Sequence, residues 1–292
     1  MLAESTGVWS LDVSPLSRIA IILTVLAVLA AIEAVLPLQR RNRLNRAHLV
    51  PNLALTLLTF ATNLVFTSAL VFALDWQASN GVGLLHLVTV PPLVELVTVV
   101  LALDLAFYVV HVAMHRRPSL WRFHRVHHAD AAVDVTTTIR QHPGETVIRY
   151  VAIAAFALPL GASAGSFAVY QLLAAVSGLL EHANLRLPRR VNQLLALLFT
   201  WPDMHKVHHA RDPRLTDTNY SNLVSWWDRL FGTFTPVRHG RAVVYGLDGT
   251  DDAPVQTFSG LLGLPFRDLA DRASGRSELR SASVAPESSA AR

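Results

Sequence analysis

Ten of the thirteen histidines lie between positions 111 and 209, and eight of them form three closely spaced groups. Box 1 has the spacing H-x-x-x-H, and boxes 2 and 3 both have the spacing H-x-x-H-H. The eight residues are His111 and His115 in box 1, His124, His127 and His128 in box 2, and His205, His208 and His209 in box 3. Spacings of three and four residues place side chains on one face of a helix. Neutral imidazole is the commonest metal ligand, and eight imidazoles exceed the four that a tetrahedral ion uses, so the sequence predicts two metal ions.

Five further histidines lie outside the boxes. His182 follows a long apolar stretch at its expected exit from the membrane, so we predict that it is a ligand as well. His142 precedes a proline, which indicates a loop, and it is a further candidate ligand. The other three have no neighbour at ligand spacing, and we interpret them as ordinary interfacial or surface residues: His48, His86 and His239.

Asp104 precedes box 1 on the same helical stripe, at offsets of 7 and 11 residues from His111 and His115. An ionised carboxylate inside a membrane span is costly and usually has a partner. Because Asp104 lies about 10 Å of helix rise before His111, we expect it to accept the free N–H of a ligand imidazole on another helix. The alternative is a buried aspartate paired with a serine, a threonine or an arginine.

Ligand spacing alone leaves the metal and the chemistry open. Nitrogen ligands without thiolates suit zinc, copper, iron or nickel, and zinc would support hydrolysis whereas iron would activate oxygen. The alternatives are therefore a zinc transporter or sensor, a metal-dependent lipid hydrolase, and a histidine patch that buffers protons or binds zinc loosely. Transporters usually place their ligands at mid-membrane, whereas these boxes flank the apolar runs, which argues against transport.

The composition indicates a membrane protein. Of 292 residues, 52% are hydrophobic and 16% are charged, well below the quarter that is usual in soluble domains. The net charge of +4 comes from arginines next to apolar runs and from a single lysine, Lys206, so nothing in the pattern indicates nucleic-acid binding. The absence of cysteine excludes disulfides and iron–sulfur clusters.

Four apolar regions must position the boxes. The runs 16–38, 49–74 and 88–113 are each long enough to cross a bilayer of about 30 Å. The fourth, 147–180, is broken at Pro159 and Gly161 into halves of about fourteen and fifteen residues, which predicts a re-entrant helical hairpin that returns to its starting side. The predicted fold is an all-α integral membrane protein with about four transmembrane helices and a cytoplasmic helical cap that carries the histidine boxes.

The distribution of arginine predicts the orientation. Arginines at 40, 41, 43 and 46 follow the first run, residues 75–90 contain no lysine or arginine, and six arginines lie in the stretch from Arg116 to Arg149. The positive-inside rule then places the N-terminus outside and the boxes in the cytoplasm. The predominance of arginine over lysine indicates a GC-rich bacterial genome, so we expect a bacterial inner membrane. The expected organisation is transmembrane helices in 1–103, a catalytic region in 104–240, a cap extension in 241–266 and a disordered tail in 267–292.

Three motifs between the boxes extend the pattern. Asp104-x3-Tyr108-x2-His111 leads into box 1, Arg140-x-His142-Pro-x-Glu145 lies between boxes 2 and 3, and Asp217-x-Asn219-Tyr-Ser with Trp227-Asp-x-Leu-Phe-Gly-Thr follows box 3. With these motifs the chain resembles, from about 104 to 234, the fatty acid hydroxylase / sterol desaturase superfamily of integral-membrane histidine-box di-iron oxygenases.

The resemblance implies two iron ions and O2 as co-substrate in the hydroxylation or desaturation of a lipid C–H bond. It implies that the eight boxed histidines and His182 are the ligands, and that Asp104, Tyr108 and Asn219 support them. Two positions depart from the pattern: Gly178 stands where some members have a histidine, and Val112 where an arginine often follows box 1. Because no cytochrome b5 domain is fused to the chain, we expect a separate electron-donor protein of the ferredoxin, rubredoxin or cytochrome type. The oligomeric state is not predicted.

Overall fold

The computed structural model describes residues 14–40, 47–236 and 243–268, and its regular structure there is helical. Two isolated β-bridges are the nearest approach to strands among these residues. The longer helices are α1 (Pro15–Val35), α2 (Leu49–Asn80), α3 (Pro92–Arg116), α4 (Pro118–His128), α5 (Pro143–Leu160) and α6 (Ala164–His182). The shorter ones are η2 (Leu84–His86), η3 (Val135–Ile139), α7 (Arg189–Leu195), α8 (Pro202–His208), α9 (Pro213–Thr216), α10 (Trp226–Leu230), α11 (Phe258–Gly263) and η5 (Leu264–Phe266).

Four helices are long and apolar enough to cross a membrane: α1, α2 with its continuation to His86, α3 and α6. Large apolar side chains on them are exposed, for example Leu57 at 73% and Phe72 at 75%. A soluble protein would not leave so much apolar surface in water, whereas lipid would cover it. The predicted all-α membrane fold is confirmed, although α2 extends six residues beyond its predicted end.

The predicted hairpin is present, but its halves are longer than expected. Helix α5 has 18 residues and α6 has 19, because Pro159 lies within the last turn of α5 and the helix ends only at Gly161. Gly161 adopts the left-handed conformation, with a φ of 70°. Helix α6 is therefore a candidate membrane span by itself. Helix α5 begins beside the boxed histidines and α6 ends beside them, as a hairpin that returns to its starting side must.

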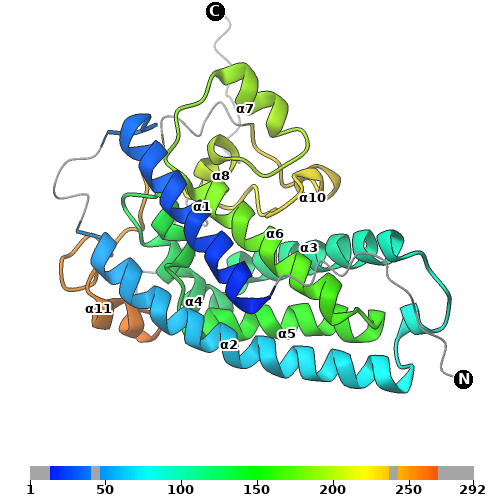
Figure 1. Cartoon of the computed structure of the whole chain (residues 1–292). Coiled ribbons are helices and arrows are strands. Elements are labelled where there is room, and N and C mark those ends of the chain that lie inside the picture. Colours follow the sequence, from blue (N-terminus) through cyan, green and yellow to red (C-terminus); the bar gives the residue numbers. More distant parts are fainter. Residues whose placement is uncertain (1–13, 41–46, 237–242, 269–292) are drawn as a thin grey trace, which may run out of the picture.

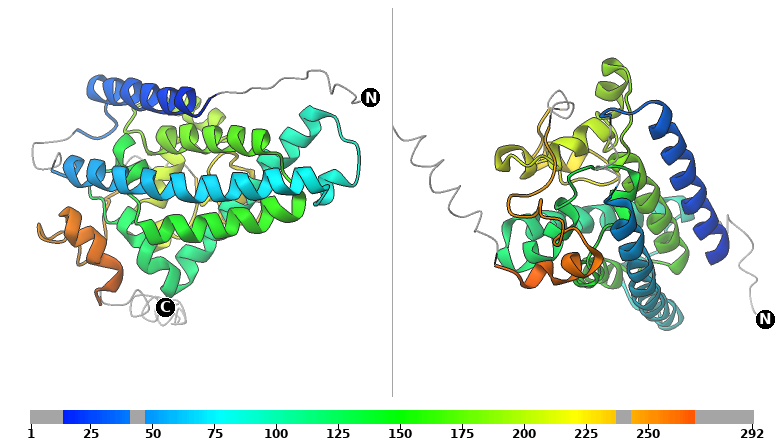
Figure 2. Two further views of the ribbon diagram at one scale, coloured as in Figure 1. Left: turned by 60° about the horizontal axis from the view of Figure 1, so that its bottom comes forward. Right: turned by 90° about the vertical axis from the view of Figure 1, so that its left-hand side faces the viewer.

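The long helices pack around α3, which contacts α4, α5 and α6, while α2 lies along α5 (Figure 1). Their shared core contains Leu74, Val99, Leu103, Ala157 and Phe167. Helices α2, α5 and α6 run side by side in the bundle, as a second view shows (Figure 2). This bundle fixes the C-terminal ends of α3 and α6 near each other.

The short helices form the cap. Helices α7, α8 and α10 lie together on one side of the bundle, and α11 lies on another, near the first turns of α2 (Figure 1). Leu261 and Leu264 of the cap extension pack against Leu55 of α2 and Val126 of α4. The predictions for Arg41, Arg43, Arg46 and His239, and for the tail beyond residue 268, lie outside the described residues.

Candidate metal centre

Four helices deliver the nine predicted histidine ligands to one place. Box 1 occupies the last turns of α3, box 2 the C-terminal half of α4, and box 3 lies on α8 with its last member as the C-cap, while His182 ends α6. All nine side chains are buried, and the most exposed, His127, is 5% exposed. Burial of nine imidazoles without water needs a compensating interaction, because buried polar groups otherwise lose their hydrogen bonds.

The nine histidines fall into two groups, in each of which one possible ligand atom per residue lies within 4.8 Å of all the others. The first group has five members and the second has four. The first group is His111, His115, His124, His128 and His208, and the second group is His127, His182, His205 and His209. Box 2 and box 3 each contribute to both groups, because adjacent histidines on a helix diverge by about 100°.

The spacing of the nitrogen atoms fits a metal ion. In the second group, Nε2 of His182 lies 3.0 Å from that of His127, 3.0 Å from that of His205 and 3.1 Å from that of His209. One imidazole nitrogen cannot hydrogen-bond to three others at once. An ion about 2.1 Å from each nitrogen would instead separate neighbouring nitrogens by about 3 Å. In the first group, the buried Nε2 of His128 has no hydrogen-bond partner and is available to such an ion.

Burial keeps these imidazoles in the neutral form that binds metal. Desolvation lowers the pKa of His127 to about 3, with the neighbouring His124 as the second cause. Burial, followed by repulsion from adjacent histidines, also lowers the pKa of His128, His205 and His209 well below the usual value. Neutral imidazoles have a lone pair for a metal ion, so the folded chain presents its ligands ready to bind.

Backbone carbonyls orient three of the candidate ligands. Nδ1 of His111 lies 2.7 Å from the Tyr220 carbonyl oxygen, and Nδ1 of His208 lies 2.9 Å from that of Thr218. In the second group, Nδ1 of His182 lies 2.7 Å from the carbonyl of Gly178, one turn earlier on α6. Each carbonyl can only accept, so it holds the proton on Nδ1 and leaves Nε2 for the metal.

Carboxylates orient two further candidate ligands, both in the first group. Oε1 of Glu145 lies 3.0 Å from Nδ1 of His124, and Oδ1 of Asp217 lies 3.2 Å from Nδ1 of His115. Glu145 is 1% exposed and closes the motif that begins at Arg140. Both carboxylates belong to the motifs between and after the boxes, but histidine spacing alone does not reveal their role.

Asn219 and Tyr108 form hydrogen bonds that hold the loop after box 3, which contains the carbonyls of Thr218 and Tyr220. Asn219 adopts a φ of 56°, which asparagine tolerates, and its amide donates to the carbonyls of Met204 and Thr235 at 3.0 Å. The Tyr108 hydroxyl lies 2.9 Å from Oγ1 of Thr233, at the end of the same loop. Neither side chain contacts a ligand imidazole through these bonds, so their support of the centre is indirect.

Asp104 differs from its prediction. It accepts hydrogen bonds from the backbone N–H groups of Leu223 (3.0 Å) and Val224 (3.2 Å) and from the indole of Trp227 (2.9 Å), and not from a histidine. The reason is that the loop after box 3 folds back along α3, so that its N–H groups and the Trp227 indole occupy the hydrogen-bonding positions of the carboxylate. Asp104 therefore anchors the loop whose other end holds the Thr218 and Tyr220 carbonyls.

His142 lies outside both groups. It is the N-cap of α5, and its Nδ1 accepts from the Gly144 N–H at 2.9 Å. Its ring faces Phe123, at 5.3 Å between centroids. This geometry gives the histidine a local structural role and does not bring it to the centre.

His48 differs from the interpretation as an ordinary interfacial residue. It is 8% exposed, and its Nδ1 lies 3.1 Å from the Asp130 carboxylate. Asp130 follows box 2 by two residues and also accepts from Asn52 and Thr137. Arg140 completes this network with bonds to Asn52 and to the Val126 carbonyl inside box 2. The network fastens α4 to the start of α2.

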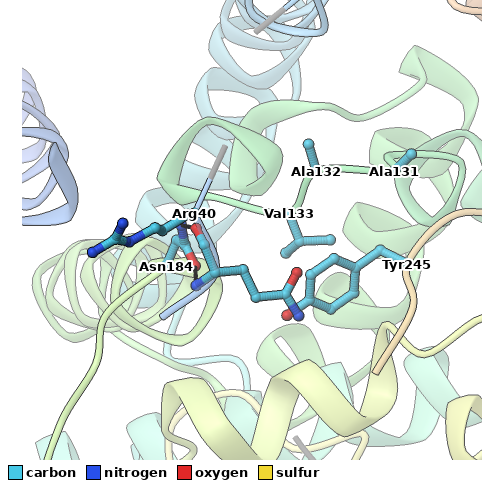
Figure 3. Close-up of a pocket in the computed structure, with 7 residues that line it drawn as sticks. Arg40, Ala131, Ala132, Val133, Asn184 and Tyr245 are labelled. Carbon is cyan, nitrogen blue, oxygen red and sulfur yellow. Dashed lines mark hydrogen bonds between the residues drawn. The ribbon is translucent and has the colours of Figure 1, made fainter. Parts of the chain in front are cut away.

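One small cavity lies between the cap and the loop after box 2 (Figure 3). Its volume is about 20 Å³, and Gln39, Asn184, Tyr245 and Val133 line it. That volume holds about one water molecule, so this cavity cannot take a lipid chain. Beside it, Lys206 is fully buried, and its ammonium donates to the carbonyls of Val133 and His182.

Sequence similarity relates part of this chain to one protein family and to several named enzymes. Residues 96–233 match the fatty acid hydroxylase family. Alkylglycerol monooxygenase of Danio rerio is 32% identical over 160 residues, which are 54% of this chain and 33% of that protein. Ornithine lipid hydroxylase OlsE of Rhizobium tropici is 34% identical over 134 residues, 45% of this chain and 39% of that protein. The chain thus spans little more than a third of the length of these relatives, and no solved structure gives a significant match.

Proposed function

We propose that this chain, whose residues 96–233 match the fatty acid hydroxylase family, is a membrane oxygenase that hydroxylates a C–H bond of a lipid. The reaction would use O2 and electrons from a separate donor protein of the ferredoxin, rubredoxin or cytochrome type. The observation that carries the proposal is the convergence of nine buried histidines into a group of five and a group of four.

Each group would hold one iron ion. Bound there, the two ions would supply the activation of O2 that the oxidation of an unactivated C–H bond requires. The protein's own part is to aim the imidazoles, through the carbonyls of Tyr220, Thr218 and Gly178 and the carboxylate of Glu145. Burial of all nine ligands keeps water from the centre, which protects a strong oxidant from side reactions.

Two observations favour an iron oxygenase over a zinc protein. Five imidazoles in one group exceed the four ligands of a structural zinc site, and no thiolate is present. Two of the relatives that match are named as a monooxygenase and a hydroxylase, which supports hydroxylation rather than desaturation. The lipid would come from the bilayer, because His111, His115 and His182 lie at the ends of two candidate membrane spans, α3 and α6.

Turnover under 18O-labelled O2 tests the reaction. The protein would be reconstituted in lipid with iron and a reducing donor, and the lipids analysed by mass spectrometry. Hydroxylation predicts one labelled oxygen atom in a product alcohol and no product from His205→Ala. An alkene two hydrogens lighter would show a desaturase. Label taken from water instead of O2 would show a hydrolase and contradict the proposal.

A further inference from the structure

The cap exposes a cluster of large apolar side chains around α7 and α10. Six residues, which we term the cap apolar face, are each between 49% and 69% exposed: Leu194, Leu197, Leu198, Phe199, Leu230 and Phe231. The segment from Val191 to Pro202 contains no charged residue. An apolar cluster of this kind on a protein surface marks a contact with a partner or with a membrane.

The two halves of the cap apolar face form one surface. Phe199 and Val224 make an isolated β-bridge, and the Ser225 N–H donates to the Leu198 carbonyl at 3.2 Å. The guanidinium of Arg229 donates to the Ala196 carbonyl at 2.8 Å. Helices α7 and α10 accordingly lie on the same side of the bundle (Figure 1).

The hydrogen bonds of Asp104 show where along the length of α3 this surface lies. The Trp227 indole, on α10, donates to the Asp104 carboxylate at 2.9 Å. Asp104 lies twelve residues before the end of α3, which is about 18 Å of helix rise. Phe231, just after α10, stacks on Tyr108 of α3 at 5.3 Å between ring centroids. Helix α10 therefore lies beside the candidate membrane span of α3 and not beyond its end.

We propose that the cap apolar face is inserted into the bilayer, in the acyl-chain region of the leaflet that adjoins the histidine centre. At the depth of Asp104 the bilayer, with a hydrocarbon core of about 30 Å, is the surrounding medium of α3. The surface continues the exposed apolar side of α3, where Val109 is 47% exposed. The exposed Arg189 and Arg190 begin α7 at its edge, where their charges would meet lipid phosphates.

This arrangement makes the cap a monotopic element in addition to the spanning helices. Apolar residues on one face with arginines at the rim are typical of segments that lie in the membrane interface. The proposal rests on the four candidate helices crossing the membrane, and it is independent of the reaction that the centre catalyses.

Single-cysteine labelling tests the proposal directly, since the chain has no cysteine of its own. Leu198→Cys and Leu230→Cys would carry a bimane fluorophore in nanodiscs of phosphatidylcholine and phosphatidylglycerol. Val244→Cys is the matched control, because Val244 has the same 69% exposure as Leu230 but lies beside the ion pair of Arg211 and Asp251. Doxyl-labelled phospholipid and aqueous iodide would be the two quenchers.

We expect doxyl lipid to quench the labels at 198 and 230 several-fold more than the label at 244, and iodide to show the reverse order. Iodide quenching at 198 and 230 as strong as at 244 would overturn the proposal. So would protection of both positions from both quenchers, which would mean that protein covers the face. Leu194→Cys replaces either variant that fails to fold, and the readout does not depend on iron or activity.

Discussion

Glu145 and Asp217 give two histidines of the first group a carboxylate partner within 3.2 Å. A carboxylate that accepts the Nδ1–H of an imidazole fixes its tautomer and makes its other nitrogen a stronger donor to a metal. In the second group, Nδ1 of His182 lies 2.7 Å from the neutral carbonyl of Gly178, and the carboxylate of Glu181 is farther from it, at 3.8 Å. The two groups therefore differ in how closely a carboxylate approaches a histidine, as well as in the number of their histidines.

Glu145→Gln is expected to lower iron affinity or turnover by about 10- to 100-fold, since the neutral amide no longer fixes the His124 tautomer. Iron per chain by elemental analysis, together with turnover, measures the effect. Glu95→Gln is the matched control. It makes the same change at a carboxylate that binds Ser163 and Ser166, far along α3 from the histidines. Equal losses in the two variants would mean that Glu145 has no specific role.

His182→Ala is expected to remove iron from the purified protein, because it deletes a ligand at the middle of the second group. His142→Ala should leave the iron content close to wild type, since that side chain caps α5 outside both groups. The two variants make the same substitution at the two histidines outside the boxes that the sequence offers as candidate ligands. Loss of iron from His142→Ala with folding intact would make that residue a ligand after all.

The convergence of these histidines could be predicted from the sequence because their spacing is local. Boxes 1, 2 and 3 lie on α3, α4 and α8 with its C-cap, so helical geometry alone places the histidines of a box on one face. The partners of Asp104 and His48 could not be predicted in the same way. Asp104 binds residues about 120 positions later, and His48 binds an aspartate 82 positions later. Such contacts depend on how whole segments pack.

At the scale of the elements, the turn between α5 and α6 determines whether His182 returns to the centre. Gly161 adopts a left-handed conformation, and a Cβ there would lie 2.9 Å from the Cα of Gly83. The sequence predicted this break from Pro159 and the glycines, but it underestimated both helices. A proline near the C-terminal end of a helix need not end it, and the remaining apolar residues extend each half.

Gly161→Ala is expected to destabilise the protein more than Gly81→Ala does. Both glycines have positive φ, so each alanine costs about 1 kcal/mol of backbone strain. Only Gly161 is crowded, since a Cβ at Gly81 meets nothing within 4 Å. The midpoint of thermal unfolding in detergent measures both variants. Equal midpoints would show that the contact of Gly161 with Gly83 is not tight.

The loop after box 3 could not be placed from the sequence. By sequence alone, its two adjacent tryptophans, Trp226 and Trp227, fit either an anchor at the lipid headgroups or a buried aromatic core. The structure separates their roles, because Trp227 binds Asp104 while Trp226 is 48% exposed. The roles of the two tryptophans depend on the depth at which the cap contacts α3. The loop has no sequence periodicity from which that depth could be predicted.

For the whole molecule, the composition and the apolar runs sufficed to predict a helical membrane protein. Its orientation remains a prediction of the arginine distribution. We expect Val82→Cys, in the loop after α2, to react with a membrane-impermeant maleimide in intact cells. Val244→Cys, on the cap, should react only after the membrane is permeabilised. The opposite pattern of labelling would place the histidine centre outside the cytoplasm.

The content of iron tests the central claim most directly. Protein purified without oxygen and loaded with 57Fe should contain two irons per chain, by elemental analysis and by Mössbauer spectroscopy, because the five-histidine and four-histidine groups would each hold one ion. One iron per chain, or tightly bound zinc that iron cannot replace, would contradict the account.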